Sequence, residues 1–339
     1  MKKLTIVILN FNGKDFLEKF LPSVIQFSEG HEIIVADNCS SDESVLFLEK
    51  TFPDIRLIKN ASNGGFARGY NDALKLVDSE LYLLLNSDIE VTENWLNPLL
   101  EVMKDPDVAG CQPKIRAFYA KHNFEHAGAS GGFLDKDYFP FCRGRIFQKI
   151  EEDTGQYNDA IEVFWSTGAA LMIRSKLYHE TGGLDEDFFA HMEEIDLCWR
   201  LKKRGYKFMV EPKSVVYHVG GGTLDYSSPF KTYLNFRNSL FMIVKNHEGL
   251  LFPKMFRRLI LDGIAGIRFL VRGEFKQLGS VFKAHRDVYL KLGTSLDKRK
   301  QIKKNSTHFN KKGLFNDSIL WQRYILKKDL FSDLPKEKF

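Results

Sequence analysis

The chain has 339 residues, of which 44% are hydrophobic and 27% charged, proportions that are ordinary for a globular protein. This length suits one α/β domain with an extension, and 29 Phe residues supply material for a large core. The Cys residues form no C-x-x-C pair, which argues against a zinc site or a disulfide framework and favours the reduced thiols of a cytosol. They are Cys39, Cys111, Cys142 and Cys198.

The net charge of +5 conceals an asymmetry along the chain. Residues 245–339 hold 22 Lys and Arg against 9 Asp and Glu, a net charge of +13, so the remaining residues carry −8. A basic tail on an acidic body favours an anionic partner such as a membrane or a nucleic acid, although a solvated Lys-rich helical face explains it equally well. The sequence has no nucleic-acid recognition motif, so we do not expect a nucleic-acid partner.

Apolar stretches and helix-length segments alternate through the first 110 residues. Strands that are apolar throughout are typical of a parallel sheet covered by helices on both faces. Ligands of such sheets bind beyond the carboxyl ends of the strands. We predict strands at 4–10, 32–38, 55–59 and 81–88, with helices at 14–26, 43–50 and 66–77.

The rest of the chain is less regular. Residues 114–161 lack periodicity and are interpreted as an irregular insertion over the site. Two short strands are predicted after residue 206, and helices are predicted from residue 229 to the end. The apolar run at 4–9 is too short for a signal peptide or a membrane span, and no other uncharged stretch has spanning length.

Polar residues follow several of the predicted strands. Asp37 ends the second strand, where a carboxylate can accept a hydrogen bond from a nucleotide base or ribose. The spacing of Ser40 and Glu43 predicts a capping box for the next helix. Gly64 and Gly65 allow a tight turn and close backbone approach to a ligand, although a plain strand-to-helix loop is an equal alternative.

Asn86, Ser87 and Asp88 end the fourth strand, where hard oxygen ligands suit Mg²⁺ or Mn²⁺. A polar turn is the alternative for any single Asp. His218 ends a β-branched run before three glycines. It is either a structural residue or, together with Asp88, part of a metal site.

Seven stretches occur in an order that resembles glycosyltransferase family 2, whose members are inverting enzymes with the GT-A fold. They are TIVILNFNG, VADNCSSDES, NGGFARGYN, LLLNSDIE, FWSTGAALMIRSKLYHETGGLDEDFF, MEEIDLCWRLKKRGY and VVYHVGGG. The resemblance covers residues 1–245 and points to the bacterial rhamnosyltransferase-like members that make surface polysaccharides.

This resemblance implies an α/β fold in which helices flank a mostly parallel sheet, followed by a helical C-terminal extension. The catalytic domain would span 1–244, with a nucleotide-binding half at 1–110 and an acceptor and base half at 111–244. Residues 245–339 would form the basic helical extension.

The resemblance also assigns roles to the polar residues. Asp37 would bind the nucleobase. Asp88 would be the last acid of the family's D-x-D metal motif, in which Asn86 takes the first position, and His218 would be a late metal or diphosphate ligand, with Mg²⁺ or Mn²⁺ as the cofactor. The nucleotide-sugar pocket would consist of Asn10, Asn12, Asp37, Asn38, Asn63, Gly64, Gly65, Gly69, Asn71 and Asn86.

An acidic trio begins the helix predicted near residue 193. Inverting transfer needs a base for the acceptor hydroxyl. Glu194 occupies the family's base position, where Glu replaces the usual Asp. Glu193 and Asp196 share a helical face from which Glu194 points away, so we expect these two to fix the helix start. The alternative is that all three acids only complement the helix dipole.

The stretch before this helix resembles the family's loop beneath the donor sugar and the acceptor. Trp165, Thr167 and Gly168 are its candidate residues, although Trp165 could simply fill the core. Asp185 and Asp187 are interpreted as loop residues that position the base helix.

These features predict an inverting glycosyltransferase that uses a UDP- or dTDP-sugar and a glycan or lipid-linked acceptor. The alternative is a non-catalytic sugar-nucleotide-binding or assembly protein of the same fold. A sugar nucleotidyltransferase is disfavoured because LNFNGKDF lacks the Gly-rich, basic loop that a triphosphate needs.

The tail gives a further expectation about location. Leu259, Gly263, Gly266 and Leu270 mark one face of a predicted helix, and arginines at 257, 258, 268 and 272 flank it. This pattern is typical of a helix lying on a membrane surface, which predicts a cytoplasmic protein attached to the inner face of the cytoplasmic membrane. Packing on the catalytic domain, or a homodimer contact, is an equal alternative.

Overall fold

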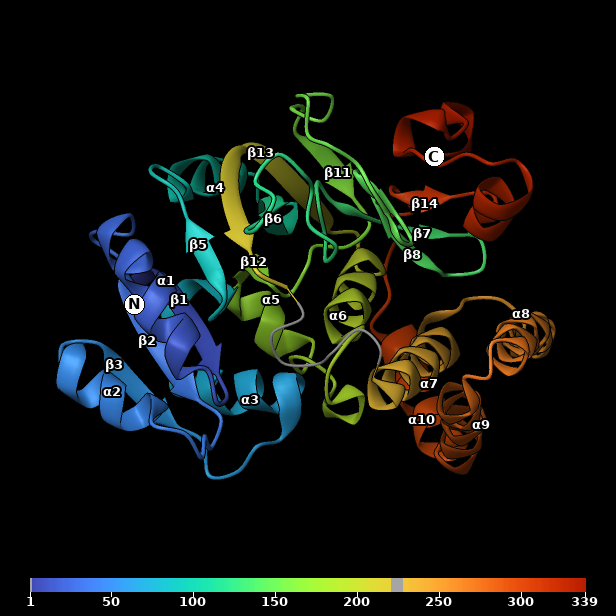
Figure 1. Cartoon of the computed structure of the whole chain (residues 1–339), viewed down its shortest axis with the longest axis horizontal. Coiled ribbons are helices and arrows are strands. Elements are labelled where there is room, and N and C mark those ends of the chain that lie inside the picture. The colour runs from blue at the N-terminus through green and yellow to red at the C-terminus, as the bar shows by residue number, and fades with distance from the viewer. Residues whose placement is uncertain (1, 221–227) are drawn as a thin grey trace.

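The computed structural model describes residues 2–220 and 228–339. Figure 1 shows a central sheet with helices on both faces, a smaller sheet beside it, and a group of C-terminal helices along one side. In the central sheet the strand order is β11-β13-β6-β12-β4-β1-β2-β3, and β5 pairs with β13. Gly221 and Gly222 of the VVYHVGGG stretch lie outside the described residues.

The N-terminal half confirms the predicted parallel sheet. Alternate side chains of β1 enter two separate cores, with Val7 on one face and Ile6 and Ile8 on the other, which explains why the strand is apolar throughout. The strands are β1 (Lys2–Asn10), β2 (Glu32–Asp37), β3 (Arg56–Lys59) and β4 (Ser79–Asn86). The helices are α1 (Lys14–Gln26), α2 (Ser44–Thr51) and α3 (Gly65–Leu74).

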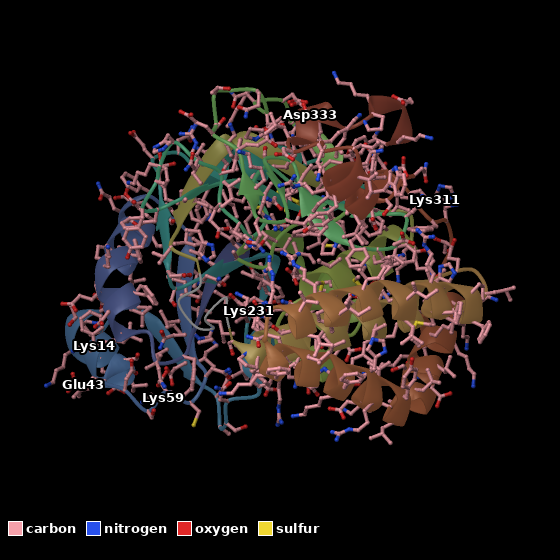
Figure 2. All side chains as sticks on the ribbon, turned by 45° about the vertical axis from the view of Figure 1, so that its right-hand side comes forward. Lys14, Glu43, Lys59, Lys231, Lys311 and Asp333 are labelled. Atoms are coloured by element: carbon pink, nitrogen blue, oxygen red, sulfur yellow. The ribbon has the colours of Figure 1, made fainter. Side chains whose placement is uncertain are left out.

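The predicted capping box before α2 is wrong. The helix begins at Ser44, and no side chain caps it. Glu43 instead forms an exposed ion pair with Lys14, 2.9 Å from Oε2 to Nζ (Figure 2). Ser40 uses its hydroxyl to accept a hydrogen bond from the backbone N–H of Asn12, so it ties the first two loops together.

Beyond β4 the sheet becomes mixed, because β12 runs antiparallel to both β4 and β6. The prediction of two short strands after residue 206 is wrong, since β13 is one continuous strand. The elements are β5 (Ile89–Val91), α4 (Leu96–Val102), β6 (Val108–Ala117), β11 (Ile161–Val163), β12 (Ala170–Arg174), α5 (Ser175–Glu180), η1 (Glu186–Phe188), α6 (Glu193–Lys202) and β13 (Lys207–His218).

The region interpreted as an irregular insertion contains a second sheet of order β10-β9-β8-β7-β14. Its last strand comes from the far end of the chain, where Phe315 and Phe339 pack with ring centroids 4.9 Å apart and Phe331 lies 5.0 Å from Phe133. The strands are β7 (Gly132–Asp135), β8 (Pro140–Cys142), β9 (Arg145–Ile146), β10 (Lys149–Ile150) and β14 (Leu314–Phe315).

Four helices precede this returning segment, so the prediction of helices to the end of the chain fails beyond Lys304. They are α7 (Pro229–Asn246), α8 (Leu251–Val271), α9 (Phe275–Leu290) and α10 (Leu292–Lys304). Only short turns of helix follow, η2 (Trp321–Ile325), η3 (Phe331–Asp333) and η4 (Lys336–Lys338).

The predicted domain boundary at residue 244 falls inside α7, whose second half is almost entirely buried. How the chain divides into domains therefore stays a prediction. Among the described helices, none combines the length and the apolar character needed to cross a membrane.

Candidate active site

A cluster of amides and one carboxylate forms where β1 and β2 end. Asn10 donates from Nδ2 to Oδ1 of Asp37 over 3.1 Å, and Asn38 donates from Nδ2 to Oδ1 of Asn63 over 2.9 Å. Asn12 accepts a hydrogen bond at Oδ1 from the backbone N–H of Ser41. Oδ1 of Asn10 is buried and has no donor among the described residues, so a ligand could satisfy it.

Two glycines in the first turns of α3 pack too closely against neighbouring groups for a side chain to fit easily. Gly65 has φ +80°, and a Cβ there would lie 2.4 Å from the carbonyl oxygen of Phe189. A Cβ at Gly69 would lie 3.0 Å from the Asn38 amide. Gly64 is less constrained, because its added Cβ would meet only the flexible side chain of Arg68. The first turns of α3 thus contact both the amide cluster and the loop before α6.

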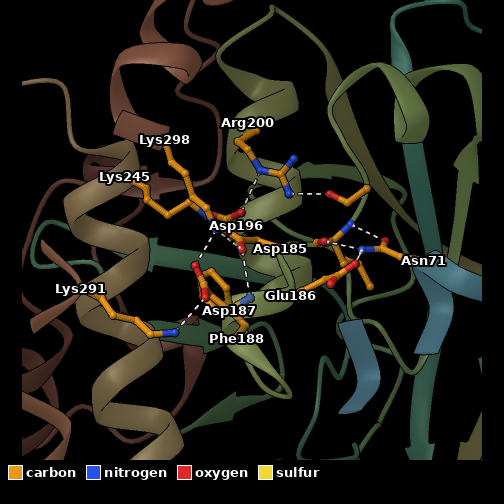
Figure 3. Close-up of polar contacts among 12 residues, drawn as sticks. Asn71, Asp185, Glu186, Asp187, Phe188, Asp196, Arg200, Lys245, Lys291 and Lys298 are labelled. Carbon is orange, nitrogen blue, oxygen red and sulfur yellow. Dashed lines mark hydrogen bonds and ion pairs between the residues drawn. The ribbon is translucent and has the colours of Figure 1, made fainter. Parts of the chain in front are cut away.

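Asn71 is not brought together with this amide cluster. Its Oδ1 accepts from the hydroxyl of Tyr178 and the N–H of Leu184, and its Nδ2 donates to the carbonyl of Leu184 and to Glu186. All four hydrogen-bonding positions of the amide are therefore used within the protein. These contacts fasten α3 to the loop before α6 (Figure 3).

Asp88 and His218 meet where β4 and β13 end. Nε2 of His218 lies 3.1 Å from Oδ1 of Asp88 and 3.4 Å from Nδ2 of Asn86, while its Nδ1 lies 3.3 Å from Oε2 of Glu125. Burial alone would lower the pKa of His218, but Asp88 and Glu125 together raise it to about 10. Without a metal ion the two carboxylates thus favour the protonated imidazole, and a cation bound at Nε2 would have to replace the proton there.

Sequence reasoning missed Glu125, which follows β6 in a stretch without periodicity. Burial would raise its pKa, but the charge of His218 and the N–H of Ala127 outweigh burial and lower it. Among residues 2–220 and 228–339, no three His, Cys, Asp or Glu side chains form a metal-binding group by themselves. If a cation binds beside His218, most of its coordination positions would therefore be filled by ligands from outside the protein.

Glu193 and Glu194 begin α6; Glu193 is buried, Glu194 is partly exposed with its Oε2 buried, and neither forms an ion pair in the part of the chain that the structure describes. Burial, reinforced for Glu193 by the charge of Glu194, raises the pKa of Glu193 well above its ordinary value. Burial also raises the pKa of Glu194 to about 7, although backbone N–H groups oppose the shift. Oε2 of each has no hydrogen-bond partner among the described residues, a costly arrangement that is common at reactive sites.

The predicted acceptor loop lies next to this acid. A Cβ at Gly168 would lie 3.1 Å from the ring of Phe66 and 3.6 Å from Cβ of Glu194. Thr167 is buried and donates its backbone N–H to Gln112. Trp165 is buried and donates from Nε1 to the carbonyl of Phe133, so its indole fills the core beside the second sheet.

Asp196 differs from its two acidic neighbours because cations surround it. Oδ2 accepts from Nε of Arg200 over 2.8 Å, and Oδ1 lies 2.8 Å from Nζ of Lys245 and accepts from Asn246 over 2.7 Å. Burial would raise the pKa of Asp196, but Lys245 and Arg200 outweigh it and lower the pKa. Its carboxylate is therefore fully engaged in holding α6 against α7.

Lysines of the C-terminal helices also form ion pairs with the acidic loop before α6, as Figure 3 shows. Lys245 also pairs with Asp185, and Lys298 of α10 binds Asp185 and Asp187, each over 2.6 Å. Lys291 binds Asp187 over 3.0 Å. A cavity of about 420 Å³ lies among these groups. Asp185 precedes the short helix η1, as expected for a loop residue, whereas Asp187 lies within η1; the C-terminal helices hold both.

The backbone just before α6 is strained. Phe189, His191 and Met192 all have positive φ, at 65°, 70° and 73°, which costs energy for residues other than Gly. Asn238 of α7 holds this segment, because its Nδ2 donates to the carbonyls of Phe188, Ala190 and His191 over 2.8–2.9 Å. The start of α6 is thus held in place by a residue of α7.

Comparison with known proteins shows the family. The model of glycosyl transferase family 2 matches residues 5–182. Among curated relatives, N-acetylglucosaminyl-diphospho-decaprenol L-rhamnosyltransferase of Mycobacterium tuberculosis is 25% identical over 63% of this chain and 75% of its own length. Rhamnosyltransferase WbbL of Escherichia coli K12 is 23% identical over 63% of this chain and 82% of its own.

Solved structures share the fold. The mannosyltransferase PcManGT from Pyrobaculum calidifontis, in complex with GDP-Man and Mn²⁺, superposes with a TM-score of 0.52 at 13% identity, over 89% of this chain and 85% of that one. GalNAc-T7 with UDP, GalNAc and Mn²⁺ superposes with a TM-score of 0.54 at 17% identity, over 72% of this chain and 48% of that one. The chain thus belongs to glycosyl transferase family 2, and the protein is a glycosyltransferase with the GT-A fold.

Proposed function

We propose that the protein is an inverting glycosyltransferase that moves a sugar from a nucleoside-diphosphate sugar to a hydroxyl of a glycan or lipid-linked acceptor in cell-surface polysaccharide synthesis. The observation that carries this proposal is the carboxylate of Glu194, whose Oε2 is buried without a hydrogen-bond partner among the described residues and whose side chain lies beside Gly168. The names of the two rhamnosyltransferase relatives support sugar transfer, and the name of the Mycobacterium tuberculosis protein supports a lipid-linked acceptor.

In this reaction Glu194 takes the proton of the acceptor hydroxyl while the hydroxyl oxygen attacks the anomeric carbon. The new glycosidic bond forms as the bond to the diphosphate breaks, and the nucleoside diphosphate leaves with the bonding electrons. A base is most effective when its pKa lies near the working pH, and burial raises that of Glu194 to about 7. Glu193 and Asp196 act as positioning residues at the start of α6.

The donor, a UDP- or dTDP-sugar, binds at the carboxyl ends of β1 to β4. Asp37 and the amides of Asn10, Asn38 and Asn63 contact the nucleoside. A carboxylate, an imidazole and an amide converge at Asp88, His218 and Asn86, a donor set that suits Mg²⁺ or Mn²⁺ when phosphates and water supply the other ligands. The cation would neutralise charge on the departing diphosphate, and the Mn²⁺ in the two solved structures supports this assignment.

The variants Asp88→Ala and His218→Ala are expected to weaken binding of the nucleoside diphosphate by at least about 10-fold, because each removes a ligand of the cation. Titration calorimetry with UDP and dTDP, with and without Mn²⁺, measures the effect. Glu90→Ala is the matched control, since Glu90 lies nearby on β5 but pairs with Lys121 at the surface. Full transfer activity in excess EDTA would contradict the metal assignment.

The transfer rate is expected to depend on the ionisation of Glu194. Only the carboxylate accepts a proton, so kcat falls about tenfold for each pH unit below the pKa of about 7 and is constant above it. A stopped assay of nucleoside-diphosphate release across this range measures the profile. A rate that stays constant down to the ordinary carboxyl range would remove Glu194 from the role of base.

We also propose that the protein works in the cytoplasm at the inner face of the membrane. Its four cysteines are free, which suits a reducing compartment. Attachment to a membrane and association of two copies would each require an exposed apolar surface on the C-terminal helices, but with different charges beside it.

A further inference from the structure

Helix α8 packs on the protein through polar residues and exposes its apolar face, the reverse of the usual arrangement. Its buried residues are Arg258, Asp262 and Gly266, whereas large apolar side chains face away from the protein. Ile264 is 59% exposed, Ile267 62% and Phe252 81%. With 3.6 residues per turn, one stripe contains Phe252, Phe256, Ile260, Ile264, Ile267 and Val271. These six side chains are called the α8 stripe below.

A polar network fixes this orientation of α8. Arg258 donates from Nε to Oδ1 of Asp262 over 2.7 Å and from Nη1 to Oγ of Ser239 in α7 over 2.7 Å. Oδ2 of Asp262 lies 3.0 Å from Nε2 of His285 in α9. Turning the helix to bury its apolar stripe would break these buried ionic contacts, which is costly. The outward direction of the stripe is therefore built into the helix packing.

The structure corrects one member of the face predicted from sequence, because Leu259 and Leu270 are exposed as expected but Gly266 is buried. Gly266 faces α9, where an added Cβ would lie 3.3 Å from Cδ1 of Leu278, and Arg258 is buried. The exposed face is rotated away from both residues. A contiguous exposed apolar stripe of this kind marks a surface that binds another protein or a membrane.

The charges beside the α8 stripe indicate which kind of partner binds it. Arg268 and Arg272 are exposed and lie along one edge of the α8 stripe, where Arg257 also lies but pairs with Asp137 over 2.6 Å. The one acid of α8, Asp262, is buried in the polar network. An apolar face edged by Arg268 and Arg272 complements an anionic lipid surface, in which the apolar side chains enter the acyl region and the two arginines contact the headgroups.

We infer that the α8 stripe inserts into the interface of an anionic membrane and holds the protein at its surface. A second copy of the chain fits less well. A symmetric dimer contact would place the arginines of one α8 near those of the other, and α8 offers no exposed acid to pair with them. This inference concerns attachment and does not depend on the transfer reaction. It specifies which residues bind the lipid.

The test is co-sedimentation of the full chain with vesicles of phosphatidylcholine alone or mixed with phosphatidylglycerol. The protein is expected to bind the anionic vesicles and to dissociate as salt is raised. The triple variant Ile260→Ser, Ile264→Ser, Ile267→Ser should bind at least about 100-fold more weakly. Arg268→Gln with Arg272→Gln should weaken binding roughly fivefold for each charge removed.

Leu46→Ser with Leu76→Ser is the matched control, because these exposed leucines, 50% and 59% accessible, lie outside α8. This control should bind vesicles like the wild type. Donor hydrolysis and thermal melting of every variant establish that the fold and the site are intact, so a failed reaction is distinguished from failed attachment.

Three results would overturn the inference. They are absence of binding to anionic vesicles at low salt, equal binding by the triple variant and the wild type, and a dimer in sedimentation velocity that the triple variant dissociates. The last result would assign the stripe to a second copy.

Discussion

Replacing Glu194 with Gln is expected to reduce the rate of sugar transfer by about 10²–10⁴-fold, the usual contribution of a general base. Gln keeps the shape of the side chain but cannot accept the proton of the acceptor hydroxyl. Binding of the nucleotide sugar should be unchanged, because the donor cluster lies at the ends of β1, β2 and β4. Steady-state kinetics and calorimetry on the same preparation separate the two quantities.

The same variant is expected to be more stable than the wild type at high pH. Burial raises the folded-state pKa of Glu194 above its unfolded value. The stability from this group is fully present below the unfolded pKa and is lost as pH rises through about 7, where the buried charge must form. Thermal melting should therefore show a higher Tm for Glu194→Gln above about pH 7, with a difference that shrinks as pH falls.

Glu193→Gln provides the matched comparison. It removes a neighbouring buried carboxylate whose pKa is also raised, so it should give a similar gain in stability. If Glu193 only positions the helix, its loss should cost far less activity than the loss of Glu194. Transfer by Glu194→Gln at the wild-type rate would assign the base elsewhere. A wild-type protein that neither transfers the sugar nor hydrolyses the donor would favour the non-catalytic alternative.

The nucleotide-binding half could be predicted from local sequence patterns. Apolar strands buried on both faces have a continuous signature, and the polar residues that follow them are forced to one edge of the sheet. This logic placed Asn10, Asp37 and Asp88 where the strands end. The family resemblance then singled out Glu194 among three adjacent acids, which local pattern alone could not do.

The features of the site and the fold that could not be predicted from sequence depend on contacts between segments that are distant in the chain. Glu125 becomes significant only because the fold brings it to His218. Strand β14 has two residues and no periodicity, and it exists because β7 offers it a partner. From sequence, Asp196 is expected only to help fix the helix start, and the partners that make it do so, Lys245 and Asn246 of α7, lie about 50 residues away in the chain.

The C-terminal helices therefore contribute to the site itself. Lys245, Lys291 and Lys298 bind the acidic loop before α6, and Asn238 binds the strained backbone that follows it. A positive-φ segment persists only when its surroundings hold it. Removing the cations or the amide should let this segment relax and displace the carboxylate of Glu194.

Asn238→Leu is accordingly expected to lower kcat about 100-fold, because a displacement near 1 Å at a reacting group has an effect of this size. The variant removes the donor that Asn238 gives to the carbonyls of Ala190 and His191, at a cost of about 1–3 kcal/mol in stability. The KM for the donor should change little, since Asn238 does not contact the donor cluster. This split between kcat and KM distinguishes loss of positioning from general unfolding.

Asn310→Leu is the matched control for this experiment. Asn310 also comes from the C-terminal region and donates from Nδ2 to Glu162 and to the carbonyl of Tyr206, but it does not contact the loop before α6. It should lose stability to a similar extent and keep its kcat. If both variants lose kcat in proportion to their loss of Tm, then α7 stabilises the fold without positioning the base. A fall in kcat confined to Asn238→Leu, with a shifted pH profile, would show that the strained segment before α6 sets the position and the pKa of Glu194.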